Sequence, residues 1–477
     1  MDLFCCLPIL DLKSPGLHDR GILIIVIRFT NSGYMHPIDQ PLTSPLQRLL
    51  QRTINLKPGE GRAVFWSFLY FFLLLSSYYI LRPIRDEMGV TVGVDQMQWL
   101  FTGTFIAMLA VVPLFGWITS RYRRRRFLPI IYGFFIVNIL LFYLLFESNA
   151  GISLVAGLFF VWLSVYNLFI VSVFWSFMAD LFRNEQARRL FGFIATGGTS
   201  GAIAGPALTA LLVQQLGTSH MLLISAALLG MSLVCILRLL AWQEATAPEE
   251  GAGRHPVQDK AEALGGGILN GFFLLLRSPY LLGICALIVL YASLSTFLYL
   301  QQAQIVRDAF DDSETRTAVF AGIDFAVNLL TLVIQVFFTG RLVKWLGLGM
   351  TLALIPLLLS IGFLILGLQP LLPVLIVVQV LRRAGNYAIM RPAREMLYVV
   401  VSREEKYKAK NFIDTVVYRG GDALSSWVYA GMRGFGLTLS VIAWIAVPLS
   451  LAWAWIAFRL GRQQAVLGER NGLNREE

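Results

Sequence analysis

Long apolar runs separated by short polar breaks make up most of the chain. A helix that crosses a bilayer needs roughly twenty consecutive, mostly apolar residues, and about twelve runs meet that requirement. The first six expected spans cover residues 63–81, 97–118, 127–146, 152–178, 190–212 and 221–240. The other six cover residues 280–302, 318–340, 347–368, 371–397, 412–433 and 437–458. The pattern predicts an all-α polytopic membrane protein with about twelve transmembrane helices.

The longest polar break lies near the middle of the chain and divides the expected spans into two sets of six. It contains prolines and charges of both signs, which are typical of a linker. The expected organisation is an N-terminal arm with a short interfacial helix (1–62), a six-helix bundle (63–241), a cytoplasmic linker (242–272), a second six-helix bundle (273–460) and a cytoplasmic tail (461–477).

The two sets of spans share a short internal repeat. RNEQAR at 183–188 follows the fourth span and REEKYK at 403–408 follows the tenth, and each precedes a helix with a glycine at the same offset, Gly201 or Gly421. Parallel repeats of this kind are typical of the major-facilitator architecture, in which the substrate binds between the halves near the membrane midplane. A chance likeness between two cytoplasmic loops would also explain the repeat.

Composition and charge agree with a membrane protein. Only 14% of the residues are charged, whereas soluble proteins average about 25%. The net charge is +10, but the basic residues gather in short loops such as RYRRRR at 121–126, so no nucleic-acid partner is expected. The positive-inside rule then places these loops and both termini in the cytoplasm. The expected location is the cell membrane, and a bacterial inner membrane fits best.

No sequence motif points to an enzyme, a cofactor or a metal site. The chain lacks G-x-x-x-x-G-K-[ST], a C-x-x-C pair, a catalytic triad pattern and a glycosidase-like pair of carboxylates. Gly197, Gly201 and Gly205 form a ladder of small residues in the fifth span. The ladder favours close helix packing over the alternative of cradling a phosphate.

Charged residues within apolar spans are the first candidates for function, because each costs on the order of 3 kcal/mol or more in hydrocarbon. Arg82, at the end of the first span, is either an interfacial anchor that reaches the headgroups or a cavity residue. Arg85 next to Asp86, just after Pro83, fits a cavity-facing pair better. Asp324 in the eighth span is a further candidate for charge pairing or coupling.

The tenth span carries several polar residues on one side. Arg383, Asn386 and Arg394 lie close to one helical face. A face of this kind would not be tolerated in lipid, so it predicts a wet cavity. Arg394 with Glu395 is alternatively a pair at the cytoplasmic end of the helix.

The eleventh span contains Asp414, Arg419 and Asp422 in an otherwise apolar and small-residue helix. Arg419 is either neutralised in a salt bridge or offers its planar guanidinium to an anion. The two interpretations are compatible if the pair opens when the anion binds.

Several segments of the chain resemble the bacterial and plastid ATP/ADP translocases. YILRPIRD at 79–86 is similar to the family's Y-T-I-L-R-D-T-K-D, and SVFWSF at 172–177 is similar to S-V-L-F-W-x-F. RPAREMLY at 391–398 resembles D-P-x-K-E-M-A-Y-I-P-L. KAKNFIDTVV at 408–417, followed by RGG, resembles K-x-K-x-A-I-D-V-V with a basic residue before glycine. The likeness runs from about residue 56 to residue 460.

The resemblance implies twelve spans of the major-facilitator type and exchange of nucleotides. It places two family lysines thought to bind substrate at Arg85 and Arg419, where a planar fork replaces a point charge. Two functional glutamates of the family fall on Asn167 and near Ser295 or Thr296, so this sequence has neither acid.

These observations predict a secondary active transporter for an anionic solute, best matched by nucleotide exchange of the ATP:ADP antiporter type. Its expected partners are a small anionic substrate and the lipid bilayer, and a monomer is compatible with the sequence. The expected substrate-binding residues are Arg85, Arg383, Arg419, Asn167 and Asn386, and the expected charge-pairing or coupling residues are Asp86, Asp324, Asp414 and Asp422. The alternatives are a proton-coupled or facilitative carrier of another organic ion, and a non-transporting membrane scaffold.

Overall fold

The computed structural model describes residues 56–473, except residues 58, 122–123, 149–150 and 246–273. The expected interfacial helix and most of the expected linker therefore lie outside the described residues. Within the described part, every regular element is a helix. The fold class is all-α, as the apolar runs predict.

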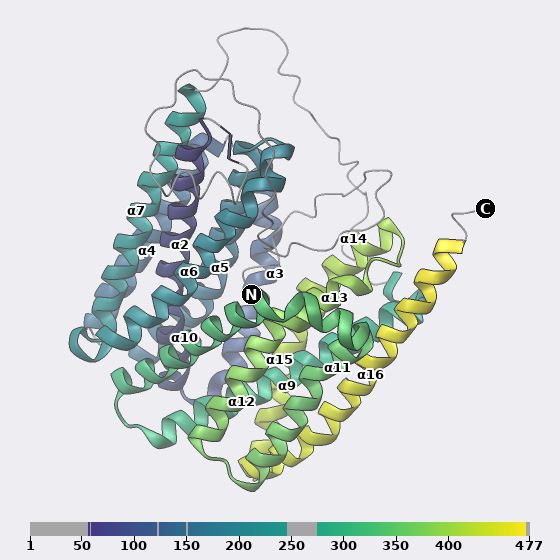
Figure 1. The fold of residues 1–477 in the computed structure, drawn as a ribbon. Helices are drawn as coiled ribbons and strands as arrows, with labels where there is room; N and C mark the ends of the chain where they lie inside the picture. The colour runs from purple at the N-terminus through teal and green to yellow at the C-terminus, as the bar shows by residue number, and fades with distance from the viewer. Residues whose placement is uncertain (1–55, 58, 122–123, 149–150, 246–273, 474–477) are drawn as a thin grey trace.

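The helices form two groups that follow one another along the chain, here called the first half and the second half (Figure 1). The first half comprises α2 (Gly61–Val92), η1 (Val94–Gln96), α3 (Met97–Arg121), α4 (Arg124–Ser148), α5 (Ile152–Leu181), α6 (Asn184–Leu216) and α7 (Thr218–Ala245). The second half comprises α9 (Pro279–Ala309), α10 (Ser313–Phe337), α11 (Thr339–Leu368), α12 (Leu372–Gly385), η2 (Asn386–Met390), α13 (Arg391–Leu397), α14 (Arg403–Phe412), η3 (Ile413–Val417), α15 (Tyr418–Gly434) and α16 (Leu439–Leu473). The turn η1 is a 3₁₀ helix, whereas η2 and η3 are π-helical.

Every expected span falls on one or more of these helices. Among the described residues, nine helices are long and apolar enough to cross a membrane. The expected span on α6 is not among them, and its helix is rich in glycine. The tenth and eleventh expected spans are divided by the π-helical turns η2 and η3, so α12, α13 and α15 have only 14, 7 and 17 residues. α12 and α15 also carry charged residues. Polar interruptions of this kind mark helices that face protein or a cavity instead of lipid.

One expected boundary is wrong. The span expected at 318–340 runs past the end of α10 at Phe337, and α11 already begins at Thr339. The residues around this break are apolar, so hydropathy alone does not reveal it. α11 then kinks at Gly347, whose φ of 72° is readily adopted only by glycine.

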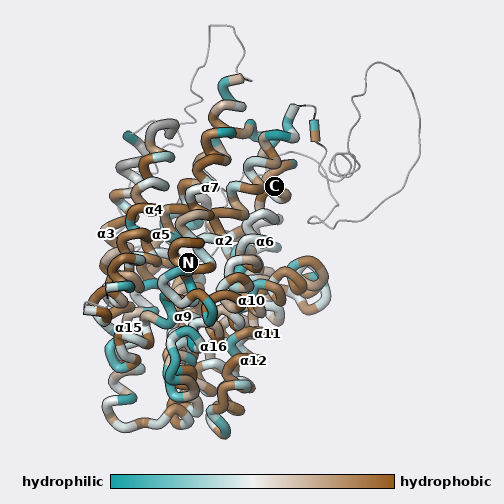
Figure 2. The backbone as a smooth tube through the Cα atoms, turned by 90° about the vertical axis from the view of Figure 1, so that its left-hand side faces the viewer, coloured by the Kyte–Doolittle hydropathy of each residue, from teal (hydrophilic) through white to brown (hydrophobic). Residues whose placement is uncertain are grey.

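Apolar side chains cover the outer surface of several helices. Ile130 is 69% exposed, and Leu154 and Leu211 are each 71% exposed. Figure 2 shows apolar residues along much of α3, α4 and α7. Such extensive apolar surface is unusual on a soluble monomer, and it fits helices that face lipid.

Each half has its own hydrophobic core. The first core includes Phe174, and the second includes Trp453. Met97 of the first half packs into the second core, next to the end of α2. The halves therefore meet where α2 ends. We call this side of the molecule the Val92 end, and the opposite side, where α2 begins, the Gly61 end.

Glycines allow α6 to lie directly against α2. A Cβ placed on Gly197 would lie 2.5 Å from the carbonyl oxygen of Phe68, and one on Gly205 would lie 2.7 Å from that of Ser76. The glycine ladder is therefore a packing device, as its spacing favours. The matching glycine of the second half, Gly421, similarly faces α9.

Candidate functional site

A small polar cavity of about 120 Å³, here called the central cavity, lies between the two halves. It is lined from the first half by Arg82, Arg85, Asp86 and Phe101, and from the second half by Tyr291, Ser295, Thr296, Tyr299, Gln379, Arg382, Arg383, Tyr387, Tyr418, Arg419 and Asp422. Charged groups from helices far apart in the sequence thus converge on one point.

Helix geometry explains this convergence. Arg82, Arg85 and Asp86 are spaced by three and four residues, so they share one face of α2. Arg382 and Arg383 lie in the last turn of α12, directly before the π-helical turn η2. π-helical turns break the regular hydrogen-bond pattern and occur frequently at functional sites. Here the π-helical turn η2 comes shortly after the neighbouring residues Arg382 and Arg383.

One buried carboxylate holds two arginines from opposite halves. Oδ1 of Asp324 in α10 lies 2.5 Å from Nη2 of Arg383. Its Oδ2 lies 3.5 Å from Nε of Arg82, and the Asp324 side chain is 1% exposed. Neither contact has hydrogen-bond geometry, so the attraction is one of charge. A single aspartate therefore compensates two guanidiniums.

Two further arginines have no ion-pair partner among the described residues. Arg85 lies over the ring of Phe160, with its guanidinium carbon 4.2 Å from the ring centre. Arg382 donates hydrogen bonds to the amide oxygen of Gln379 (3.0 Å) and to the hydroxyl of Ser295 (2.6 Å). Both partners are neutral, so the positive charge of Arg382 remains uncompensated.

The remaining charges of the central cavity form looser pairs. Arg419 Nη1 lies 3.5 Å from Oδ2 of Asp422, whose other oxygen accepts a hydrogen bond from Thr296 at 3.3 Å. Asp86 accepts a hydrogen bond of 2.9 Å from the hydroxyl of Tyr299. The 3.5 Å distance between Arg419 and Asp422 is long for an ion pair. A competing anion could therefore displace Asp422 from Arg419.

Positive charge is in excess at this site, because five arginines face three aspartates. One buried N–H group each of Arg82, Arg85 and Arg383 has no hydrogen-bond acceptor. A buried donor left unsatisfied costs about 1–3 kcal/mol, and more when it is charged. An anion with several oxygens would supply the missing acceptors from both halves at once.

Aromatic rings complete the wall of the central cavity. The rings of Tyr291 and Tyr418 are stacked at 5.8 Å between centres, with an interplanar angle of 20°. Phe101 meets Tyr299 edge-on at 5.7 Å. Flat apolar surface next to guanidinium groups suits a ligand that has both a planar part and an anionic part.

The structure brings together most, but not all, of the site residues expected from the sequence. The expected residues that line the central cavity are Arg85, Arg383, Arg419, Asp86 and Asp422. Asp324 lies behind its wall, and Asn386 is buried and donates a hydrogen bond to the hydroxyl of Tyr291 (2.8 Å). Asn167 is buried in α5 and does not line this cavity.

Asp414 and Arg394 lie outside the central cavity. Asp414 is 3.3 Å from Nη2 of Arg394. Arg394 also approaches Glu395 at 3.9 Å, and Lys410 lies 2.5 Å from the same glutamate. The pairs join α13 to α14 and η3, so these charges tie helices together instead of facing the cavity.

Two cavity arginines were not selected from the sequence as binding residues. Arg82, for which an interfacial anchor was one expectation, is 14% exposed and paired with Asp324. Arg382 lies beside Arg383, and the cost of charge in an apolar span applies to both. Gln379 lies three residues earlier on the same helix face and accepts a hydrogen bond from Arg382. This polar residue in an apolar span is the sequence feature that could have identified Arg382 as a cavity residue.

Contacts between the halves close the Val92 end. Glu87 of α2 is fully buried and accepts two hydrogen bonds, of 2.7 and 2.9 Å, from Arg316 of α10. Trp427 of α15 donates a hydrogen bond of 3.0 Å to the hydroxyl of Thr102 in α3. Arginine pairs of this two-pronged kind are strong and specific in geometry.

Comparison with known proteins identifies the family and the fold. The sequence profile of the Major Facilitator Superfamily matches residues 63–407. A POT family transporter in complex with a thioalcohol-conjugated peptide has a TM-score of 0.59 at 13% identity, covering 84% of this chain and 96% of that one. The nucleoside transporter NupG has a TM-score of 0.57 at 14% identity, covering 85% and 99%. At these identities the likeness shows the fold alone.

Two curated relatives share about a fifth of their aligned residues with this chain. ADP,ATP carrier protein 1 of Chlamydia trachomatis is 21% identical over 324 residues, and the match spans 61% of this chain and 61% of that protein. ADP,ATP carrier protein 2 of Chlamydia pneumoniae is 20% identical over 499 residues, covering 88% and 92%. These relatives and the structural neighbours are transporters, not enzymes. The chain is a multi-pass membrane protein and belongs to the Major Facilitator Superfamily.

Proposed function

We propose that this carrier exchanges anionic, phosphate-bearing organic solutes by alternating access, with nucleotides as the first candidates. The excess of arginine over aspartate around the central cavity carries the proposal. The oxygens of a phosphoryl group would accept hydrogen bonds from the Arg82 and Arg85 N–H groups that have no acceptor in the first half, and from Arg383 in the second, whose contact with Asp324 lacks hydrogen-bond geometry. One anion would then be held by both halves.

Exchange follows from the charge of the empty central cavity. To reorient without a solute, the carrier would have to move uncompensated guanidiniums past apolar surface. Unpaired buried charge carries a penalty of several kcal/mol per ion. A bound anion removes that penalty, so the loaded carrier reorients and the empty one does not. Transport into a vesicle then requires a counter-solute inside it.

Two observations favour nucleotides among phosphate-bearing solutes. The relatives named as carriers of ADP and ATP match up to 88% of this chain, and the aromatic wall offers surface for a planar base. The central cavity of about 120 Å³ is smaller than the roughly 300–1,000 Å³ of sites for drug-sized ligands. In this state it holds a group the size of a phosphoryl, and the halves must part to admit a whole nucleotide.

The charge of the loops supports an orientation for the proposed carrier. Basic residues concentrate in the loops at the Gly61 end, and the positive-inside rule assigns that end to the cytoplasm. The contacts of Glu87 and Trp427 then close the outer side. The state described is, in this proposal, the inward-facing one in a bacterial inner membrane.

Exchange in proteoliposomes tests the proposal. Purified protein is reconstituted into vesicles loaded with ADP, with ATP or with neither, and labelled ATP is added outside. We expect uptake that depends on internal nucleotide and that is lost in Arg419→Ala. Equal uptake into empty and loaded vesicles would contradict exchange, and the absence of uptake by folded protein would contradict nucleotides as the solute.

A proton-coupled carrier of another organic ion is the second candidate. The carboxylates of Asp86 and Asp422 line the central cavity, and the two family glutamates are replaced at Asn167 and at Ser295 or Thr296. Uptake into unloaded vesicles driven by an imposed pH gradient would favour this candidate. Uptake that ignores the gradient and follows internal solute would exclude it.

A further inference from the structure

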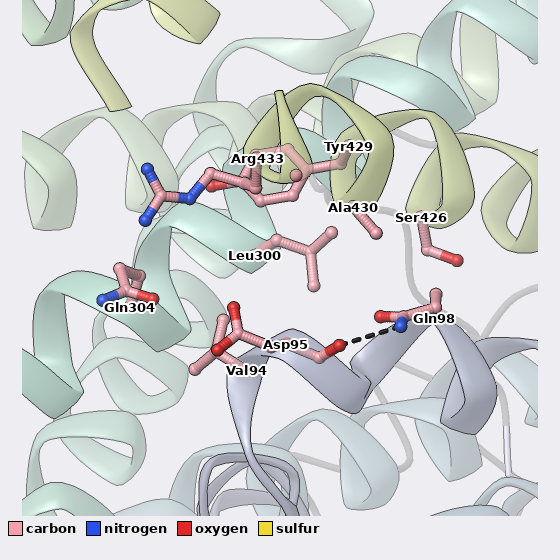
Figure 3. Close-up of a pocket in the computed structure, with 10 residues that line it drawn as sticks. Val94, Asp95, Gln98, Leu300, Gln304, Ser426, Tyr429, Ala430 and Arg433 are labelled. Atoms are coloured by element: carbon pink, nitrogen blue, oxygen red, sulfur yellow. Dashed lines mark hydrogen bonds between the residues drawn. The ribbon is translucent and has the colours of Figure 1, made fainter. Parts of the chain in front are cut away.

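A second and larger cavity, here called the outer cavity, lies nearer the Val92 end. Its volume is about 320 Å³. Figure 3 shows Asp95 of η1 and Gln98 of α3 on one wall and Tyr429 and Arg433 of α15 opposite them, with Gln304 of α9 at the side. Both halves thus contribute polar groups to a space that the proposed function does not use.

The outer cavity continues the central cavity along the same helices. On α15 the central cavity ends at Asp422 and the outer cavity begins at Ser426, about one helical turn later. On α9, Tyr299 lines the central cavity and the next residue, Leu300, lines the outer one. The Tyr299 hydroxyl donates to Asp86 of the other half at 2.9 Å. A solute crossing from the Val92 end would meet the outer cavity first and the contact between Tyr299 and Asp86 second.

The outer cavity contains polar groups that lack partners. Tyr429 is 4% exposed, and its buried hydroxyl has no hydrogen-bond partner. Arg433 donates one N–H to the carbonyl oxygen of Leu437 (2.9 Å) and has no ion-pair partner among the described residues. Asp95, on the opposite wall, likewise has no cationic partner in that part of the chain. A buried unsatisfied hydroxyl next to a guanidinium calls for ligand oxygens.

We propose that the outer cavity is a second binding site, on the Val92 side, for the transported solute, an organic anion that also carries hydroxyl groups. Arg433 binds the anionic group, the Tyr429 hydroxyl donates to one of its oxygens, and Asp95 accepts a hydrogen bond from a hydroxyl of the solute. This identification of the ligand rests on the proposed function. The solute remains there until the contact between Tyr299 and Asp86 opens.

Protection of an introduced thiol tests this site without any transport step. Ala430, which lines the outer cavity, is changed to cysteine in a chain whose four native cysteines are replaced by alanine. The rate of modification by a charged thiol reagent is then measured with ADP, ribose 5-phosphate or inorganic phosphate. We expect ADP, at about ten times its dissociation constant, to slow the reaction by roughly tenfold.

Matched variants separate the outer site from other causes of protection. Arg433→Gln should abolish the protection, and Tyr429→Phe, which removes only a hydroxyl, should weaken it. Protection should persist in Arg419→Ala, whose central cavity is damaged. The proposal is overturned if none of the three probes protects the thiol, if protection survives Arg433→Gln, or if it disappears in Arg419→Ala.

Failure of the outer site and failure of the proposed function give different results. The proposed function fails when the wild-type carrier exchanges none of the probes in loaded vesicles. The outer site fails when the thiol at position 430 is not protected, whatever the transport assay shows. Protection by inorganic phosphate as strong as that by ADP would contradict the role given to Asp95, because that role requires the hydroxyl-bearing part of the solute.

Discussion

At the scale of single residues, the carboxylate of Asp324 stands between guanidiniums from opposite halves. It lies 2.5 Å from Arg383 and 3.5 Å from Arg82, and it is almost completely buried. Water therefore cannot screen the two guanidinium charges if the carboxylate of Asp324 is removed. Removing one partner from a buried ion cluster leaves uncompensated charge and typically costs about 3–5 kcal/mol.

We accordingly expect Asp324→Asn to lower the free energy of unfolding by about 3–5 kcal/mol. The matched control is Glu147→Gln, which neutralises an exposed carboxylate near the end of α4 and should change stability by less than about 0.5 kcal/mol. Thermal unfolding in detergent, with and without millimolar ADP, measures both. ADP should stabilise the Asp324 variant more than the wild type, because the anion supplies the missing charge. Equal unfolding temperatures for the two variants would refute the role of Asp324.

At the scale of elements, close contact between α2 and α6 holds the first half together. Gly201 lies against the carbonyl oxygen of Phe72 in α2, with no room for a Cβ. Gly192, on the same helix, has no heavy atom within 4 Å of a Cβ placed on it. The two glycines differ only in what they face.

Alanine substitutions should therefore have opposite effects on stability. Gly201→Ala forces the two helices apart and should destabilise the protein by about 1–3 kcal/mol. Gly192→Ala should stabilise it by about 0.5–1 kcal/mol, because alanine restricts the unfolded chain more than glycine does. Thermal unfolding of the two variants side by side provides the measurement. A tolerated alanine at position 201 would show that the helices are not in direct contact.

The start of α2 is tied to α6 by a buried acid. Glu60 accepts hydrogen bonds from Gln186 (2.9 Å) and Arg189 (3.0 Å). Burial alone would raise the pKa of Glu60, but these hydrogen bonds outweigh it and the pKa is lowered. A lowered pKa in the folded state gives stability that is present above the unfolded pKa of about 4.3 and is lost as the pH falls through the folded pKa.

Acidification should thus destabilise the wild type more than Glu60→Gln, which cannot titrate at this position. The measurement is the difference in unfolding temperature between the two proteins at pH 6 and at pH 3.5. We expect the wild type to be the more stable at pH 6 and the difference to shrink at pH 3.5. A difference that stays constant with pH would contradict the ionised state of Glu60.

Hydropathy was sufficient to place the spans on helices, except at the break between α10 and α11, but it does not predict the ion pairs that join the helices. Arg85, Arg383 and Arg419 could be selected because charge stands out against an apolar background. The contact between Arg82 and Asp324 joins α2 to α10, and no local pattern in the sequence reports a contact across that separation. Asn167 was selected through its place in a family motif, yet it is buried in α5 and does not line the central cavity.

At the scale of the whole molecule, the halves are held together at the Val92 end by few polar contacts. The ion pair between Glu87 and Arg316 is one of these contacts, and its two side chains are only 0% and 13% exposed. Alternating access requires this end to open. The pair should therefore act as a latch whose strength sets the balance between the two orientations.

Glu87→Gln should shift the population toward a state open at the Val92 end. Spin labels at Gln96 and Asp311, which are exposed on opposite halves, report the separation by pulsed electron paramagnetic resonance. We expect a longer-distance component that is weaker or missing in the wild type. Arg307→Gln, which breaks only an exposed pair, is the control and should leave the distances unchanged. An unaltered distribution in Glu87→Gln would exclude the latch.

In the proposed function, uncompensated arginines in the cavity between the halves bind the anionic solute. Calorimetric titration tests this by measuring the affinity of the purified protein for ADP in the wild type, Arg85→Gln and Arg459→Gln. Arg459 is exposed on α16, against Trp455, and serves as the charge-matched control.

A hydrogen bond to a charged group contributes about 1.5–3 kcal/mol, which corresponds to roughly 10- to 150-fold in affinity. We expect a loss of this size in Arg85→Gln and none in Arg459→Gln. Equal affinities in all three proteins would show that the solute binds somewhere other than the arginine-lined cavity.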